Sequence, residues 1–200
     1  MIDAYLRGPK EVVLGPIARR APRAVHPIAI TLAAVVPGIG AALAAATGHN
    51  EMAVSLWLVN RALDGFDGTL ARQHERQTDL GAYLDILMDF LVYAAVPIGL
   101  AAHADNQAAW IAAAALLAAF YVNTISWAYL SALLERRERN RSREYTSITM
   151  PGGLIEGAET VVVYAIMLAV PARAPMVFWV MAAAVTITVG QRVVWAVRNL

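Results

Sequence analysis

The sequence predicts an all-α integral membrane protein, built as a bundle of six transmembrane helices behind an N-terminal interfacial helix. Apolar residues make up 59% of its 200 residues and charged residues only 16%, whereas soluble domains carry about 45–50% apolar and about 25% charged residues. Six membrane helices of about 20 residues need about 120 apolar positions, which is close to the number present. We expect one membrane domain over 1–200, with a juxtamembrane segment at 1–25 and the six-helix bundle at 26–200.

Composition also excludes several classes of protein. The chain contains no cysteine, which excludes a disulfide scaffold, cysteine–zinc sites, iron–sulfur clusters and thiol catalysis. The net charge is +1, so the total charge gives no reason to expect a nucleic-acid partner.

The juxtamembrane segment mixes apolar and basic residues and has no long apolar core. It therefore does not resemble a cleavable signal peptide. Its composition predicts a helix on the cytoplasmic membrane surface, interrupted by Pro9, Pro16 and Pro22.

Six stretches are long and apolar enough to be membrane spans. Those without a charged residue are Ile28–Thr47, Ala108–Leu134 and Ala174–Gln191. Those that carry charges are Met52–Arg72, Leu80–His103 and Leu154–Val170. A soluble fold that buries such helices is excluded because the chain is too short to surround them.

Basic residues predict the orientation of these spans. They gather in the N-terminal segment, in the loop after the second span (Arg72, Arg76) and in the loop after the fourth (Arg136–Arg143), whereas the alternate connections hold only Arg173. Short basic loops stay in the cytoplasm. Both termini are therefore expected on the cytoplasmic side of the cell (inner) membrane, which requires an even number of spans.

Four aspartates stand on the second and third predicted spans. Asp64 and Asp67 share one helical face, and Asp85 and Asp89 share another, because residues three or four apart lie on the same side of a helix. The short polar loop 73–79 makes the two helices an antiparallel hairpin. At 1.5 Å per residue, Asp67 and Asp85 lie about 7–8 Å from its loop end. Asp64 and Asp89 lie about 12–13 Å from that end, so we expect the four carboxylates to converge in two facing pairs.

Four carboxylates inside a membrane need neutralisation. Each disfavours insertion at a helix centre by about 2.5–3.5 kcal/mol, and only Arg61 and Arg72 are basic neighbours in the sequence. Oxygen ligands suit Mg²⁺ or Mn²⁺, and two such ions would balance four carboxylates. Protonation of some carboxylates, or ion pairs at a helix interface, are the alternatives. Gly68 and Gly81 leave room for a ligand beside the carboxylates, or serve helix packing.

The stretch Asp64–Asp89 resembles the signature of the CDP-alcohol phosphotransferase family, D-x-x-D-G-x-x-A-R-x8-G-x3-D-x3-D, at every fixed position. The resemblance implies a membrane transferase that moves a substituted phosphate from a CDP-linked donor to an alcohol and releases CMP. It implies that Asp64, Asp67, Asp85 and Asp89 bind two divalent metal ions. Asp89 would also be the general base that takes the proton of the acceptor hydroxyl.

The resemblance further implies a donor site and a homodimer. The residues expected at the CDP donor are Gly68, Ala71, Arg72, Thr78, Gly81 and, in a partial match to a Pro-Asn-x-x-Thr start of the first span, Thr31. Arg72 suits a diphosphate because a guanidinium binds phosphate oxygens in pairs. CDP-diacylglycerol, a small polar alcohol and membrane lipids are the expected partners.

The acceptor pocket is expected at Glu156 and Glu159, with Arg192 either reaching it or extending to the cytoplasm. Members that use inositol phosphate resemble G-x-I-E-R-x-E-R here. This chain keeps both glutamates, but Gly157 and Thr160 replace the arginines, which weakens the case for inositol phosphate. The basic cluster Arg136–Arg143 fits membrane topology and anionic lipid.

Two alternatives stay open beside transfer of a phosphatidyl group. One is a transferase that uses a CDP-amino-alcohol donor and a diacylglycerol acceptor. The other is a divalent-cation transporter, since membrane carboxylates also mark ion paths.

Overall fold

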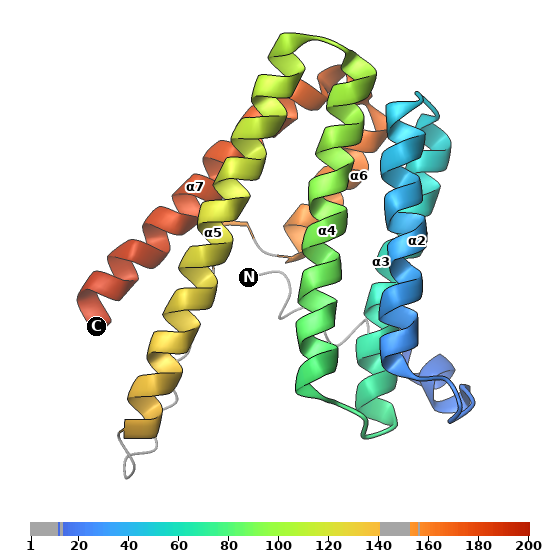
Figure 1. The fold of residues 1–200 in the computed structure, drawn as a ribbon, viewed down its shortest axis with the longest axis vertical. Coiled ribbons are helices and arrows are strands. Elements are labelled where there is room, and N and C mark those ends of the chain that lie inside the picture. Colours follow the sequence, from blue (N-terminus) through green and yellow to red (C-terminus); the bar gives the residue numbers. More distant parts are fainter. Residues whose placement is uncertain (1–11, 13, 141–152, 156) are drawn as a thin grey trace.

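The computed structural model describes residue 12 and residues 14–140, 153–155 and 157–200. All regular structure in these residues is helical, which confirms the all-α prediction (Figure 1). The elements are α2 (Pro27–Ala46), α3 (Asn50–Gln73), α4 (Asp79–Ala104), α5 (Gln107–Asn140), α6 (Gly157–Ala169), the 3₁₀ helix η1 (Pro171–Arg173) and α7 (Ala174–Asn199).

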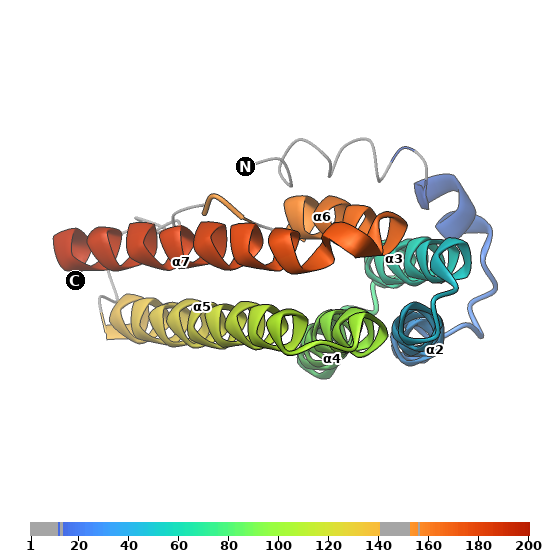
Figure 2. The ribbon, with the colours of Figure 1, turned by 90° about the horizontal axis from the view of Figure 1, so that it is seen from above.

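Successive helices run in opposite directions, as the predicted spans require. In Figure 1 the α3–α4 turn and the final turns of α5 and α7 lie at one end of the molecule, and the turns after α2, α4 and α6 lie at the other. Figure 2 shows two layers, with α2, α4 and α5 in one and α3, α6 and α7 in the other. We call the end with the α3–α4 turn the hairpin end.

Several helices are long and apolar enough to cross a membrane, so the chain is an integral membrane protein. Within the described residues, four candidates satisfy this by length and composition, namely Pro27–Ala46, Asp79–Ala104, Gln107–Arg137 and Pro171–Asn199. α3 has 24 residues but carries the charges of the acidic hairpin. α6 has 13 residues, which span only about 20 Å of a hydrocarbon core of about 30 Å. The count of six spans therefore stays a prediction for α3 and α6.

Observed helix ends differ most from the predicted spans in the second half of the chain. α5 continues through the basic run to Asn140, and α7 continues to Asn199, because residues such as Glu and Arg favour helix as well as apolar residues do. α6 begins at Gly157 instead of Leu154, since residues 153–155 are not helical. In the N-terminal segment residues 14–20 are helical, and 1–11 and 13 lie outside the described residues. The placement of this segment at a membrane surface stays a prediction.

The packed core lies in the half of the bundle away from the hairpin end. Small residues allow close approach there: a Cβ on Gly99 of α4 would overlap the carbonyl oxygen of Ala42 on α2, and one on Gly38 would press on Val92. The largest fully buried side chains include Trp57, Tyr164, Phe178, Leu100 and Met167. Tight packing of this kind holds membrane helices together where lipid is as apolar as the protein.

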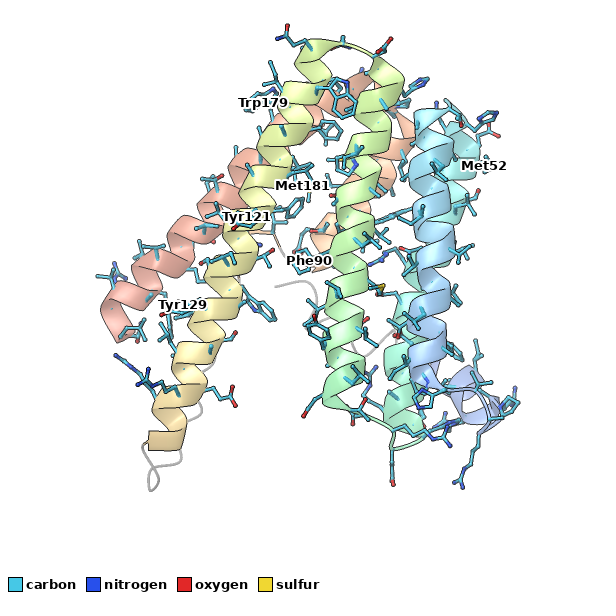
Figure 3. The ribbon with its side chains drawn as sticks, viewed as in Figure 1. Met52, Phe90, Tyr121, Tyr129, Trp179 and Met181 are labelled. Atoms are coloured by element: carbon cyan, nitrogen blue, oxygen red, sulfur yellow. The ribbon has the colours of Figure 1, made fainter. Side chains whose placement is uncertain are left out.

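α5 and α7 diverge from α4 toward the hairpin end (Figure 1). They are joined to each other by polar contacts, because Arg192 on α7 donates to the carbonyl oxygen and Oδ1 of Asn123 on α5 at 3.2 and 3.0 Å. Figure 3 labels Tyr121 and Tyr129 on α5 and Trp179 on α7, and all three side chains are exposed. Exposed aromatic side chains on apolar helices fit contact with lipid and with its interface.

Candidate active site

A cavity of about 160 Å³ opens between α2, α3 and α4 at the hairpin end. Asp67 on α3 and Asp85 on α4 both line it. All six residues that the sequence predicts for the CDP donor line it as well: Thr31, Gly68, Ala71, Arg72, Thr78 and Gly81. The hairpin therefore brings the predicted donor residues together around one opening.

A second cavity of about 10 Å³, the size of one water, lies deeper along the same helices. Asp64 and Asp89 line it together with Asn60 and Arg61, and Thr31 lines both cavities. The aspartates thus fall into an outer and an inner pair, which agrees with the depths predicted from helical rise. Asp64 is also close enough to Asp85 and Asp89 for electrostatic interaction.

Asp67, the outer aspartate on α3, is held by a contact with α2. Thr31 Oγ1 donates to Asp67 Oδ2 at 2.5 Å, and both side chains are buried. Thr31 lies one turn after the start of α2 at Pro27, a position where the missing N–H of proline is harmless. Thr31 is therefore placed by its bond to Asp67, a contact that the sequence analysis did not foresee.

The turn between α3 and α4 shapes the mouth of the cavity. Thr78 is the N-cap of α4, and its Oγ1 accepts a hydrogen bond from the backbone N–H of Gly81 at 3.0 Å. A Cβ at Gly81 would lie 3.1 Å from that same oxygen, so glycine suits this first turn. The N-terminus of a helix carries a partial positive charge and attracts anions.

Two arginines beside the signature were not predicted as site residues. Arg76 lines the outer cavity, and its Nη1 donates to the carbonyl oxygen of Arg23 at 2.7 Å. Arg61 reaches the inner pair, with Nη2 at 2.8 Å from Asp89 Oδ1 and Nη1 at 3.6 Å from Asp64 Oδ2. The contact between Arg61 and Asp64 could have been predicted, because residues three apart lie on the same face of a helix. Arg76 carried no such signal, because its position depends on the turn.

Of the predicted acceptor residues that the structure describes, neither Glu159 nor Arg192 lines either of these two cavities. Glu156 lies outside the described residues. Glu159, in the first turn of α6, is half-buried, and Arg192 is buried at the α5–α7 contact with Asn123. The acceptor role of these residues stays a prediction.

The four aspartates of the hairpin suit a hard divalent cation, because carboxylate oxygens are the ligands that Mg²⁺ and Mn²⁺ prefer. Among the described residues, however, no three His, Asp or Glu side chains are arranged to hold one ion. The inner pair, Asp64 and Asp89, shares the Arg61 guanidinium. Each carboxylate has two oxygens, so a contact with Arg61 through one is compatible with ligation through the other.

Comparison with known proteins identifies the family. The sequence profile of the CDP-alcohol phosphatidyltransferases matches residues 24–190, and the chain belongs to this family. It is 38% identical to inner membrane protein YnjF of Escherichia coli over 141 residues, which are 70% of this chain and 68% of that one. It is 30% identical to the phosphatidylinositol phosphate synthase of Corynebacterium glutamicum over 210 aligned positions, which cover 100% of this chain and 90% of that protein.

Solved structures share the fold. The phosphatidylinositol phosphate synthase of Mycobacterium tuberculosis with CDP-diacylglycerol bound has a TM-score of 0.70 and 24% identity, over 89% of this chain and 90% of that chain. The same enzyme in complex with manganese and citrate has a TM-score of 0.71 and 24% identity, over 90% and 88%. The chain is thus a transferase-family membrane protein with the same helical architecture.

Proposed function

We propose that this protein transfers a phosphatidyl group from CDP-diacylglycerol to the hydroxyl of a small polar alcohol and releases CMP. The observation that carries the proposal is the outer cavity, which all six predicted donor residues line beside Asp67 and Asp85. Relatives support the choice of donor, since the Mycobacterium tuberculosis enzyme of the same fold was solved with CDP-diacylglycerol bound.

The cavity suits an anionic diphosphate. Arg72 and Arg76 line it, and the N-terminus of α4 opens onto it through Thr78 and Gly81. A guanidinium binds two phosphate oxygens at once, and the N–H groups of a first helical turn bind anions. A site at the hairpin end of apolar helices also lets a soluble nucleotide meet a lipid that stays in the bilayer.

Asp64, Asp67, Asp85 and Asp89 would hold two divalent ions, Mg²⁺ or Mn²⁺. When bound, the ions would supply charge neutralisation for the diphosphate. A homologous fold solved with manganese supports a divalent ion.

Asp89 would act as the general base and take the proton of the acceptor hydroxyl. The alcohol oxygen then forms a bond to the phosphorus that carries the diacylglycerol group. The bond from that phosphorus to the CMP phosphate oxygen breaks, and CMP leaves with the electron pair.

The surroundings of the site complete the proposal. The basic loops support a location of the hairpin end and both termini on the cytoplasmic side of the inner membrane, and a relative carries the name inner membrane protein. We further propose a homodimer, which light scattering of the detergent-solubilised protein would test. Glu156, Glu159 and Arg192 remain the proposed acceptor residues.

Release of CMP from CDP-diacylglycerol by the purified protein with Mg²⁺ tests the function. The acceptors are glycerol phosphate, inositol phosphate, inositol, serine, ethanolamine and choline, each assayed separately. We expect CMP with one of them. Donor binding without CMP would mean that the acceptor is another alcohol.

Absence of donor binding would contradict the phosphatidyl donor and favour a CDP-amino-alcohol donor with diacylglycerol as acceptor. Transport of divalent ions into liposomes without any CDP compound would instead favour the transporter.

A further inference from the structure

The Arg61 side chain is largely enclosed beside the inner pair of aspartates, with 9% of it exposed. Its guanidinium lies 4.9 Å from the ring centre of Trp57 and 5.0 Å from that of Tyr93. Its Nε donates to Asn60 Oδ1 at 2.7 Å and its Nη1 donates to the Tyr93 hydroxyl at 3.0 Å. A cation between aromatic faces, with its N–H groups bonded, has one fixed orientation.

The residues around Arg61 are anchored to the packed core. Trp57 stacks on Tyr164 at 5.1 Å and donates from Nε1 to the Val161 carbonyl oxygen at 3.2 Å. The Tyr164 hydroxyl donates to the Tyr93 carbonyl oxygen at 2.7 Å. The contacts join α3, α4 and α6, and Trp57 and Tyr164 are fully buried.

Asn60 extends the same network to α2. Its Nδ2 donates to the Ala34 carbonyl oxygen at 2.7 Å, in the turn where Pro37 interrupts the helical hydrogen-bond ladder. Its Oδ1 accepts from Arg61. Four helices therefore fix the guanidinium, and none of these contacts depends on a bound substrate.

The anion that Arg61 binds most closely is Asp89, at 2.8 Å, against 3.6 Å for Asp64. A buried guanidinium without an anion is strongly unfavourable, so this pairing is held firmly. The three other carboxylates of the hairpin would repel Asp89, and one fixed positive charge beside it offsets that repulsion.

We propose that Arg61 is a positioning residue, which fixes the carboxylate of Asp89 in the orientation needed to take the acceptor proton. The base role of Asp89 belongs to the proposed function, so this inference rests on it. The signature does not include Arg61, and Arg61 does not line the donor cavity. Its loss should therefore lower kcat and leave donor binding in place.

The first experiment tests the ion pair without any assay of turnover. Arg61→Met, Asp89→Asn and the double variant are melted in detergent beside wild type. We expect each single variant to melt about 5–15 °C lower, because one buried charge loses its partner. The double variant should lose clearly less than the sum, because the close Arg61–Asp89 pair is then removed whole and neither of its two members is left without the other. Strict additivity would mean that the two groups do not interact, and would overturn the inference.

The second experiment measures kcat and the KM for CDP-diacylglycerol. The value of kcat is calculated from the concentration of protein that binds the donor. For Arg61→Met we expect kcat to fall about 100-fold, as a misplaced catalytic group does, with KM changed about twofold or less. Arg61→Lys keeps the positive charge but lacks the planar guanidinium group. Its kcat should be about tenfold higher than that of Arg61→Met.

Arg137→Met is the matched control, since Arg137 donates to the backbone oxygens of Asn199 and Leu200 at the end of α7, and it should keep wild-type kcat. An Arg61→Met variant with wild-type kcat would overturn the positioning role. A wild-type protein that shows the thermal coupling but neither binds CDP-diacylglycerol nor releases CMP with any acceptor would overturn the proposed function, and the positioning role with it.

Discussion

The two halves of the bundle are built from opposite kinds of side chain. In the half away from the hairpin end, glycine and alanine let the helices touch, as at Gly99 and Ala42, and the core there is apolar. In the half at the hairpin end, α5 and α7 diverge from α4 (Figure 1), and carboxylates and arginines line two cavities. The first half supplies stability, and the second accepts polar groups that a membrane protein carries only for function.

The comparison shows how a membrane protein can keep four aspartates. Four negatively charged aspartates disfavour folding, so α3 and α4, which carry them, must be held in place by the packed half of the bundle. Trp57 and Tyr93 lie where the halves meet, and Arg61 between them connects the apolar core to Asp89. Changes in the packed half should therefore lower mainly stability, and changes at the aspartates should lower turnover as well.

The largest effect is expected for Asp89→Asn, which keeps the shape of the side chain and removes the base. Turnover should fall by about 100-fold or more, the usual contribution of a general base. CMP release is the measurement, and binding of CDP-diacylglycerol shows that the variant is folded. Asp105→Asn is the control, because Asp105 sits in the turn after α4 with φ 46°, where asparagine is well tolerated. Unchanged turnover in Asp89→Asn would contradict its assignment as the base.

Gly99→Ala tests the packed half. The added methyl group would overlap the Ala42 carbonyl oxygen, and overpacking of a core lowers the free energy of unfolding by about 1–3 kcal/mol. Thermal unfolding in detergent measures it. Gly190→Ala makes the same change on α7, where no atom lies within 4 Å of the added Cβ, and alanine should stabilise that helix by about 0.5–1 kcal/mol. Equal melting of the two variants would mean that the close approach of α2 and α4 is not required.

The smallest effect is expected for Thr31→Val, which removes the hydroxyl that donates to Asp67. Loss of one hydrogen bond costs about 0.5–1.5 kcal/mol net, so turnover should fall about tenfold or less. Steady-state kinetics with CDP-diacylglycerol is the measurement. Thr124→Val on α5 is the matched control, because its hydroxyl bonds the Phe120 carbonyl oxygen of its own helix. A Thr31→Val enzyme as active as the control would show that Asp67 needs no support from α2.

The helical class and the acidic hairpin can be predicted from the amino-acid sequence alone, as can a group of residues that line one cavity in the structure. These features depend on local spacing: residues three and four apart share a helical face, and a short loop forces the two helices to be antiparallel. Asp67 and Asp85 could therefore be paired, and Asp64 with Asp89, before any coordinates were known. Apolar length alone overestimated α6, because residues 153–155 are not helical.

Only the tertiary structure decided which partners the charged groups have. Arg61 contacts Asp89 because Trp57, Tyr93 and Tyr164 meet from three helices. Arg192 bonds Asn123 because α7 packs on α5. Such contacts join residues far apart in the chain, and periodicity within one helix contains no information about how neighbouring helices pack side by side. The spacing of the aspartates is local and can be recognised in the sequence. The position of the Arg61 guanidinium, which contacts Asp89, depends on the packing of four helices.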